Sequence, residues 1–343
     1  MAYTTIPKST DYFNTKLYTG NYSTNAITGV GFQPDLTWIK TRTTAGENHY
    51  LFDVIRGVTK YLHSDTNAAQ GTNAATLTTF GSDGFTVGAN NSVNKSGEPL
   101  VSWNWKANGA SVSNTAGSIN STVSVNTTSG FSIVKYVGNA SQSQTVGHGL
   151  GVAPKLIIFK SSTSADDWSI CCPSVLGVDG RLTLNTTAAN SIGDNTFWNS
   201  TAPSSTLFSI GNNPRANASG QTIIAYCFAE IPGFSKMGSY EGNGNANGIF
   251  QHLGFKPAWV LIKNTTATEA YFLYDNKRGY NGSMAALFPD EAAADAFANN
   301  IDFLSNGFKI RTAGAILNGN TTKYIYMAFA SEPLVSTNGN AAT

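Results

Sequence analysis

Charged side chains are scarce in this sequence. Asp, Glu, Lys and Arg make up 12% of its 343 residues, and the formal net charge is +1. No run of Lys or Arg occurs, so the chain lacks the basic patch that neutralises phosphates in nucleic-acid complexes. Ser, Thr, Asn and 34 Gly must cover much of the surface instead. We therefore expect no nucleic-acid partner and a weakly charged exterior, which suits β proteins that work outside the cytosol, including virion proteins.

Cysteines and long apolar runs are also few. The three cysteines, Cys171, Cys172 and Cys227, are an odd number with one vicinal pair, which is not a disulfide framework. We expect them to be small buried side chains. No stretch approaches the ~18 apolar residues of a membrane span, and the first residues lack the apolar core of a signal peptide. The sequence therefore predicts neither membrane insertion nor ordinary secretion.

The usual signatures of catalytic and metal sites are missing as well. The sequence has no Gly-x-Ser-x-Gly nucleophile elbow and no Asp-x-Asp-x-Asp-Gly calcium loop. We expect no catalytic residue, no metal and no cofactor, and we expect that the protein is not an enzyme. A polysaccharide depolymerase is the minor alternative, because two carboxylates could converge only in three dimensions.

What the sequence does contain is an internal repeat with a period near ~100 residues. Each of three copies opens with an aromatic residue followed by x-Gly-Asn, continues with a Gly-x-x-Pro corner, and has a lysine six residues after that proline. The landmarks are Tyr18, Pro34 and Lys40 in the first copy, Tyr136, Pro154 and Lys160 in the second, and Tyr240, Pro257 and Lys263 in the third. We interpret the repeat as a triplication of one module.

Each copy also closes with an aromatic segment, at residues 100–105, 223–228 and 324–329. In Trp103-Asn104-Trp105 and Tyr226-Cys227-Phe228, large and small residues alternate with period two, which places the rings on one face of a strand. Gly-Asn turns and prolines separate short runs rich in Val, Ile and Thr. The pattern predicts an all-β chain of three tandem β-sandwich modules, jelly-roll or concanavalin-like. The one helix candidate is residues 289–297, whose early acids favour a helix N-terminus.

The landmarks divide the chain into six parts. They are an N-terminal arm (1–15), a first β-sandwich repeat (16–108), a Ser/Thr/Gly-rich linker (109–130), a second repeat (131–231), a third repeat (232–334) and a flexible tail (335–343). The linker is either flexible or contributes an edge strand, because Val123 and Val125 alternate with polar residues. The arm lies outside the repeat and is therefore a candidate anchor.

Two pairs of charged residues stand out in a chain that has few charges. The first and third copies share Asp-x-x-Arg-Gly, as Asp53 with Arg56 and Asp275 with Arg278, whereas the second copy lacks it. We predict a structural polar clamp within each copy. The functional alternative is a polar contact with a neighbouring subunit or a glycan.

Aromatic residues next to Asn and Gly in loops can stack on sugar rings, as they do in lectins. The candidates for glycan stacking are Trp168, Trp198, Tyr271 and Tyr280. Packing in the core or between modules is the alternative for each of them.

Four segments resemble uncharacterised structural proteins of marine tailed bacteriophages. They are residues 12–20, 31–35, 101–108 and 324–330, and the resemblance runs along essentially the whole chain. It implies tandem concanavalin-like β-sandwich modules, a location on the virion surface after assembly in the host cytoplasm, and capsid or tail proteins as partners. A homo-oligomer is compatible with this role. The resemblance carries no catalytic residues.

These observations lead to two hypotheses. The first is a non-enzymatic virion surface structural protein, which decorates the capsid or forms a knob on the tail. The second is a tail-fibre or receptor-binding protein that recognises host surface glycans.

Overall fold

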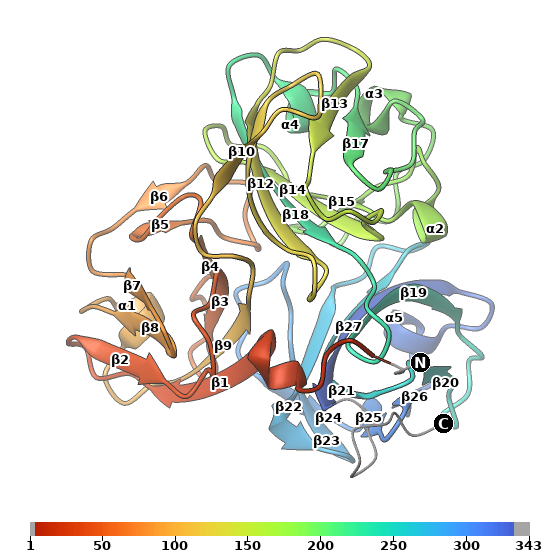
Figure 1. The fold of residues 1–343 in the computed structure, drawn as a ribbon. Helices are drawn as coiled ribbons and strands as arrows, with labels where there is room; N and C mark the ends of the chain where they lie inside the picture. The colour runs from red at the N-terminus through yellow and green to blue at the C-terminus, as the bar shows by residue number, and fades with distance from the viewer. Residues whose placement is uncertain (1–3, 333–343) are drawn as a thin grey trace.

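The computed structural model describes residues 4–332 and is an all-β structure. Strands hold 43% of the residues and helices only 7%, and the sheets are built from antiparallel pairs (Figure 1). One 3-10 helix, η1 (Ser9–Asp11), precedes the first strand. The short α-helices of four residues each are α1 (Asn91–Asn94), α2 (Pro173–Leu176), α3 (Asn195–Trp198), α4 (Pro214–Asn217) and α5 (Ala315–Asn318).

Three main sheets share one strand order. The first consists of β1 (Phe13–Thr19), β9 (Pro99–Trp105), β3 (Leu36–Thr41) and β4 (Tyr50–Asp53). The second contains β12 (Phe131–Val137), β18 (Thr222–Phe228), β14 (Leu156–Ser161) and β15 (Ser169–Cys171) in that order. The third contains β19 (Ser235–Glu241), β27 (Lys323–Glu332), β21 (Lys256–Asn264) and β22 (Phe272–Tyr280). In every case the last long strand of a segment lies between its first strand and the strand that contains the repeated lysine.

The second and third main sheets carry extra strands at their edges. The second is extended by β10 (Val112–Asn114) and β11 (Ser121–Asn126) on one side and by β16 (Leu182–Thr183) on the other. The third is extended by β23 (Ser283–Leu287) and β24 (Ala296–Ala298). A separate two-stranded ribbon, β5 (Lys60–Tyr61) with β6 (Gly71–Thr72), accompanies the first main sheet.

A small antiparallel sheet accompanies each main sheet. The small sheets are β2 (Asn25–Thr28), β8 (Gly84–Val87) and β7 (Leu77–Gly81); β13 (Gln144–Gly147) and β17 (Leu207–Ile210); and β20 (Phe250–His252), β26 (Gly307–Ile310) and β25 (Ile301–Leu304). Ile39 of β3 and Phe85 of β8 belong to one apolar cluster, which fills the space between the first pair of sheets. Two further clusters do the same for the second and third pairs.

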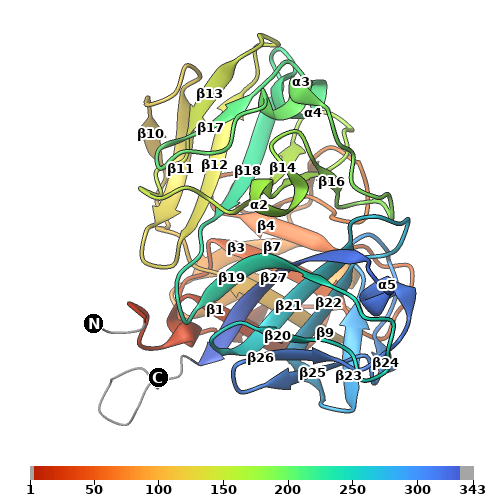
Figure 2. The ribbon, with the colours of Figure 1, turned by 90° about the vertical axis from the view of Figure 1, so that its right-hand side faces the viewer.

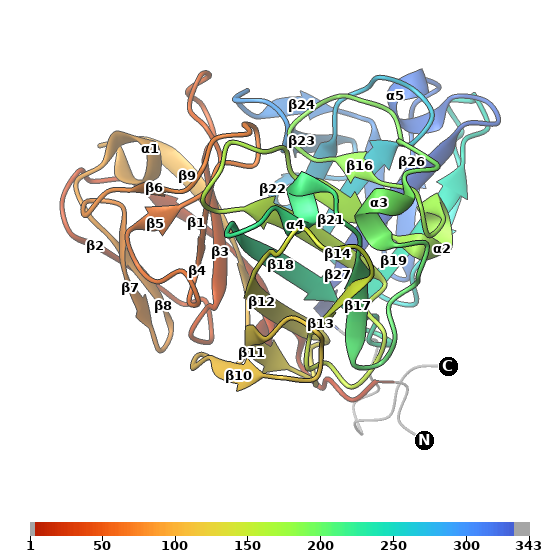
Figure 3. The ribbon, with the colours of Figure 1, turned by 90° about the horizontal axis from the view of Figure 1, so that it is seen from above.

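The opposite faces of the three main sheets meet in a fourth, central core. Trp103 and Trp105 of β9 lie in it, as do Tyr226 and Phe228 of β18. The intervening residues of β18, such as Cys227, point into the local core instead. The predicted period-two alternation is therefore confirmed for these strands. The three views show the main sheets grouped around this common centre (Figures 1, 2 and 3).

The repeated Tyr-x-Gly-Asn turn is fixed by the short helix that precedes the last strand. In each segment the tyrosine hydroxyl donates to a helix carbonyl, and a buried asparagine accepts from the backbone N–H of the turn. The tyrosine bonds are Tyr18 to Val93, Tyr136 to Ala216 and Tyr240 to Leu317, each 2.7 Å. The asparagine bonds run from the backbone N of the turn to the side-chain Oδ1. They are Asn21 to Asn94 (3.0 Å), Asn139 to Asn217 (2.8 Å) and Asn243 to Asn318 (3.0 Å). The same contacts therefore recur in all three segments.

The structure differs from the sequence predictions in three places. The segment 109–130 is not a flexible linker, because β11 pairs with β12 along its whole length and β10 forms the edge; the edge-strand alternative holds. Residues 289–297 are not a helix: after a turn they lead into β24, which pairs with β23. The arm 1–15 is also too long, since Phe13 already pairs with Trp105 in β1. The predicted tail 335–343 lies outside the described residues.

Candidate functional site

Backbone hydrogen bonds link the three main sheets at three junctions. At each junction, a loop from one segment donates to the residue that lies two positions after the repeated lysine of the next. The bonds are Gln70 N to Ser162 O (3.0 Å), Asn190 N to Thr265 O (2.9 Å) and Asp295 N to Arg42 O (2.7 Å). The first segment thus donates to the second, the second donates to the third, and the third donates to the first. The contacts form a closed ring.

The repeated lysines are buried at these junctions. Lys160 donates to Asn67 O of the first segment at 3.2 Å, and Lys263 donates to Thr187 O of the second at 3.0 Å. Lys40 donates to Thr41 O at 3.1 Å. Burial lowers the pKa of all three ammonium groups to about 8. Their N–H groups form hydrogen bonds with backbone carbonyl groups and are therefore not available to a ligand in a cleft.

The first clamp joins the first and second main sheets. Arg56 Nε lies 2.5 Å from Asp53 Oδ2, and both side chains are buried. The Tyr226 hydroxyl of β18 donates to the same carboxylate oxygen at 2.8 Å. A buried carboxylate needs such donors because it has left water. The ion pair predicted within one copy therefore also acts across a junction.

The second clamp joins the third and first main sheets in the same way. Arg278 Nε lies 2.6 Å from Asp275 Oδ2, and Arg278 Nη1 lies 2.6 Å from Asp295 Oδ1. Trp103 Nε1 of β9 donates to Asp275 Oδ2 at 2.9 Å. Trp103 and Tyr226 occupy corresponding places, opposite Trp38 of β3 and Ile158 of β14 respectively. The Asp-Arg pair of each clamp thus receives an aromatic donor from the neighbouring segment, and in the second clamp Arg42 Nε also donates to Asp295 Oδ2 at 2.8 Å.

The second–third junction has apolar residues at these places. Met327 of β27 stands opposite Leu261, where the other two sheets carry Trp103 and Tyr226. Cys172 follows Cys171, the partner of Ile157, and so takes the position of Asp53 and Asp275. This junction therefore lacks both the aromatic donor and the carboxylate acceptor of the two clamps.

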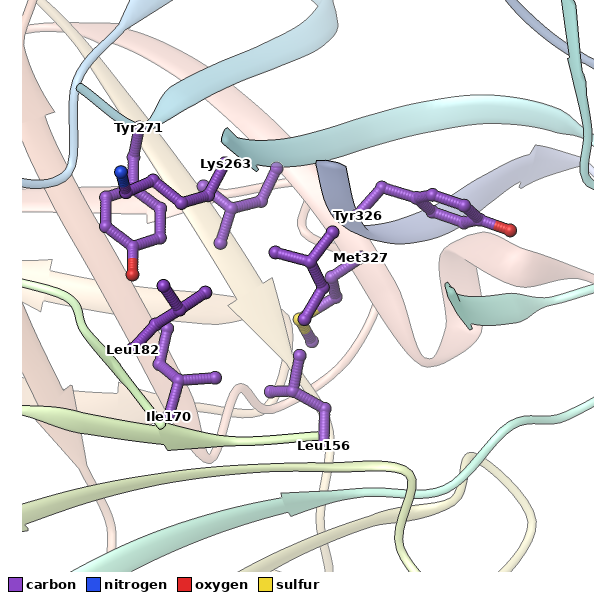
Figure 4. Close-up of a pocket in the computed structure, with 9 residues that line it drawn as sticks. Leu156, Ile170, Leu182, Lys263, Tyr271, Tyr326 and Met327 are labelled. Atoms are coloured by element: carbon purple, nitrogen blue, oxygen red, sulfur yellow. The ribbon is translucent and has the colours of Figure 1, made fainter. Parts of the chain in front are cut away.

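A cavity of about 10 Å³ marks the packing of the second–third junction (Figure 4). Leu156, Ile170 and Leu182 line it from the second segment. From the third, the Lys263 ammonium lies 5.5 Å from the centre of the Tyr271 ring. The cavity is too small for an organic ligand, so the two segments are closely packed at this part of the junction.

Three of the four glycan-stacking candidates are inaccessible. Trp168, Trp198 and Tyr271 are 0%, 2% and 1% exposed. Trp168 Nε1 donates to His63 O across the first–second junction at 2.7 Å, and Trp198 packs between the second pair of sheets. These three assignments are wrong, because large rings that flank turns here complete the cores. Tyr280 is 73% exposed and is the one candidate that could meet a sugar.

A further set of junction residues was not recognised in the sequence. Asp65, Asn185 and Asp290 occupy corresponding places, and each accepts a hydrogen bond from a backbone N–H. The donors are His49 (3.1 Å), Trp168 (2.8 Å) and Tyr271 (3.1 Å). Burial raises the pKa of Asp65 to about 6 and that of Asp290 to about 7. The spacing could have indicated these residues, since each follows its donor by a similar interval, but Asp stands there in the first and third segments and Asn in the second.

Two open pockets lie at the junctions between segments. One of about 180 Å³ lies between β1 and the third main sheet, and its walls include Thr15, Asn276 and Lys277. The other, of about 580 Å³, lies at the second–third junction beside Lys155 and Lys236. These pockets, unlike the clamps, can admit a ligand.

The described residues contain neither a cluster of potential metal ligands nor a helix that could cross a membrane. Within residues 4–332, no three His, Cys, Asp or Glu side chains are grouped so as to hold a metal ion. No helix in that part of the chain is both long and apolar enough to span a membrane. Burial raises the pKa of the Cys172 thiol to about 11, so it stays protonated and weakly reactive at neutral pH.

The fold and junctions define a class of all-β proteins in which three main sheets surround a shared core and are locked by buried polar contacts. The chain belongs to the family described as a domain of unknown function, DUF7483, which matches residues 8–333. Neither the curated proteins nor the solved structures contain a match.

Proposed function

We propose that this chain is a threefold tandem repeat of one β-sandwich module, closed into a ring, and that it serves as a non-enzymatic structural protein on the surface of a phage virion. It would decorate the capsid or form a knob on the tail. One observation carries the proposal: buried polar residues bind the segments to one another. Lys160 and Lys263 donate to carbonyl groups of the preceding segment, and Asp53 and Asp275 accept from side chains of the neighbouring one.

The energetics of the junctions fit a scaffold. An ion pair such as Asp53 with Arg56 is buried, and removing one partner leaves an uncompensated charge that costs several kcal/mol, ~3–5 in other proteins. Lys160 and Lys263 add charge-assisted hydrogen bonds to carbonyl groups of the preceding segment. Such contacts favour a unique, rigid arrangement of the segments. A rigid protein of this kind suits a structural role on the surface of a particle.

The resemblance of residues 12–20 and 101–108 to phage structural proteins supports the virion location, and the strand order common to the three main sheets supports the triplication. The experiment is antibody labelling of intact virions that encode this chain, viewed by electron microscopy. We expect label on the head or at the tail. Particles that carry no label, while the infected lysate contains the free protein, would contradict the proposal.

Recognition of host surface glycans is the second candidate. It is favoured by the polar pocket of about 180 Å³ beside β1 and by the exposed ring of Tyr280. Both candidates are compatible with this scaffold, and they differ in whether a surface site binds sugar. A depolymerase would additionally release sugar from host envelope.

A further inference from the structure

The pocket beside β1 is polar where the corresponding part of another junction is apolar. Thr15 of β1 stands opposite Trp103, and Ile133 of β12 stands opposite Tyr226, so the two residues correspond. Ile133 is fully buried in the central core. Thr15 is also buried, 5% exposed, but its Oγ1 has no hydrogen-bond partner among the described residues.

The part of the pocket lining that comes from the third segment also has polar residues where the first–second junction has apolar ones. Asn276 and Lys277 follow Asp275, just as Val54 and Ile55 follow Asp53. Val54 and Ile55 pack against the central core at the first–second junction. At the third–first junction, Asn276 and Lys277 line the pocket instead, and Asn276 Oδ1 has no partner in the described structure.

A purely structural junction does not require this polarity, because the first–second junction closes with apolar side chains. Polar residues replace apolar ones on two separate strands, and they leave an opening of about 180 Å³. Buried polar atoms without partners cost free energy. A ligand that meets this wall offers a reason for both the opening and its polarity.

The lining indicates the chemistry of the ligand. Hydroxyl and amide side chains dominate it, with Phe13 and two alanines as its apolar part. The polar residues are Thr10, Asn14, Thr15, Asn276, Lys277 and Ser331. Lys277 is the one charged side chain of this lining, which holds no carboxylate. The pocket is smaller than the ~300–1,000 Å³ of drug-sized sites, so it suits a single ring that carries hydroxyls and a negative charge.

We propose that this pocket binds one acidic sugar residue, with the Lys277 ammonium facing the sugar carboxylate and Asn276 and Thr15 among the groups facing its hydroxyls. The inference rests on the second candidate function, because it names the place and the class of glycan. It moves the sugar site away from the buried tryptophans and from Tyr280. The acidic sugar residue would enter as one unit of a host surface polysaccharide.

The test is titration of the full-length protein with D-galacturonate, with D-galactose and acetate as comparisons, followed by ligand-observed NMR. We expect galacturonate to bind more tightly than either. Loss of a charge-assisted contact in Lys277→Gln should weaken binding by about tenfold. A second variant, Asn276→Val with Lys277→Ile, copies the residues of the first–second junction and should abolish binding while the protein stays folded. Lys60→Gln is the control and should bind like the parent, because Lys60 is exposed and does not line this pocket.

Each other result counts against the pocket. Equal binding of acetate and galacturonate would reduce the site to a simple anion site, and equal binding of galactose would remove the role of Lys277. Binding that is lost in Tyr280→Ala but kept in both pocket variants would move the sugar site elsewhere and leave glycan recognition intact. No binding of any probe by the folded protein would overturn the inference, whereas the virion location is decided separately by antibody labelling.

Discussion

Tyr226 in the second main sheet donates its hydroxyl proton to Asp53 in the first, over 2.8 Å, and both side chains are buried. The two residues are far apart in sequence, so this bond acts on the packing of two segments and not on a local turn. Because the acceptor is a carboxylate that also neutralises Arg56, the bond belongs to a buried network in which the loss of one member leaves another without its partner.

Tyr226→Phe should therefore destabilise the protein by about 1.5–3 kcal/mol, the usual worth of a hydrogen bond to a charged group. Tyr271→Phe is the matched control, since Tyr271 is equally buried but its hydroxyl has no partner in the described structure. It should change stability little. The measurement is urea unfolding of both variants. A similar loss in the two would mean that ring packing, and not the bond to Asp53, holds this junction.

Asp53→Asn should have a larger effect, about 3–5 kcal/mol, because it leaves the buried Arg56 without its counter-charge. The second–third junction shows an apolar solution to the same problem, with Cys172 and Met327 at the corresponding places. Val175 follows Cys172 by three residues, as Arg56 follows Asp53. We therefore expect the triple variant Asp53→Cys, Arg56→Val and Tyr226→Met, which copies that junction, to be markedly more stable than Asp53→Asn. Differential scanning calorimetry compares the two. A triple variant as unstable as the single one would argue that the junctions are not interchangeable.

The pKa of Asp290 gives a pH-dependent prediction. Burial raises this pKa to about 7, against ~3.9 in an unfolded chain. Between these values the folded state binds more protons, so the contribution of Asp290 to stability is greatest below pH ~4 and is lost as the pH rises through 7. Asn185 shows that an amide is accepted at the corresponding place.

Asp290→Asn should thus gain stability relative to the parent as the pH rises from 4.5 to 8, because the parent alone must then bury a charge. Unfolding midpoints at several pH values measure this difference. A difference that stays constant over the whole range would show that Asp290 titrates normally.

The closed ring predicts that junction lysines act locally. Lys160→Met removes donors to Asn67 O, Ser161 O and Ser164 O, so the loop that contains Gln70 should open more often. We expect its amides to exchange with deuterium at least about tenfold faster, the equivalent of ~1.4 kcal/mol. Lys263→Met should do the same to the loop that contains Asn190. Each variant is the other's control, and exchange that rises throughout the chain in both would point to global loosening instead.

The sequence predicted the strands well and the faces of the loop residues poorly. Alternation at Trp103 and Trp105 was enough to assign one face of β9, because a strand has a strict period of two. Trp168 and Trp198 lie near turns, where no period tells the inner side from the outer. Their burial depends on which segment packs against them, and that is decided by contacts between distant parts of the chain.

The predicted helix at 289–297 failed for a related reason. Its alanines and early acids favour a helix in isolation, but Phe297 pairs with Ala285 in the third main sheet. Pairing with an existing strand satisfies the backbone polar groups at once, and this tertiary context overrides a weak local preference. The pocket beside β1 escaped prediction altogether, since Thr15 and Asn276 come together only when the third segment returns to the first.

The burial of Trp198 leads to the last prediction. Its ring lies 4.7 Å from that of Phe159 and 4.2 Å from that of Phe197, within the second local core. Trp198→Ala should cost about 3–5 kcal/mol by the cavity that it creates, whereas Tyr280→Ala, at an exposed position, should change stability by no more than about 0.5 kcal/mol. Any glycan binding lost in Trp198→Ala would then reflect unfolding. Guanidinium unfolding of both variants measures the contrast, and a Trp198→Ala protein as stable as its parent would show that this ring does not fill the core.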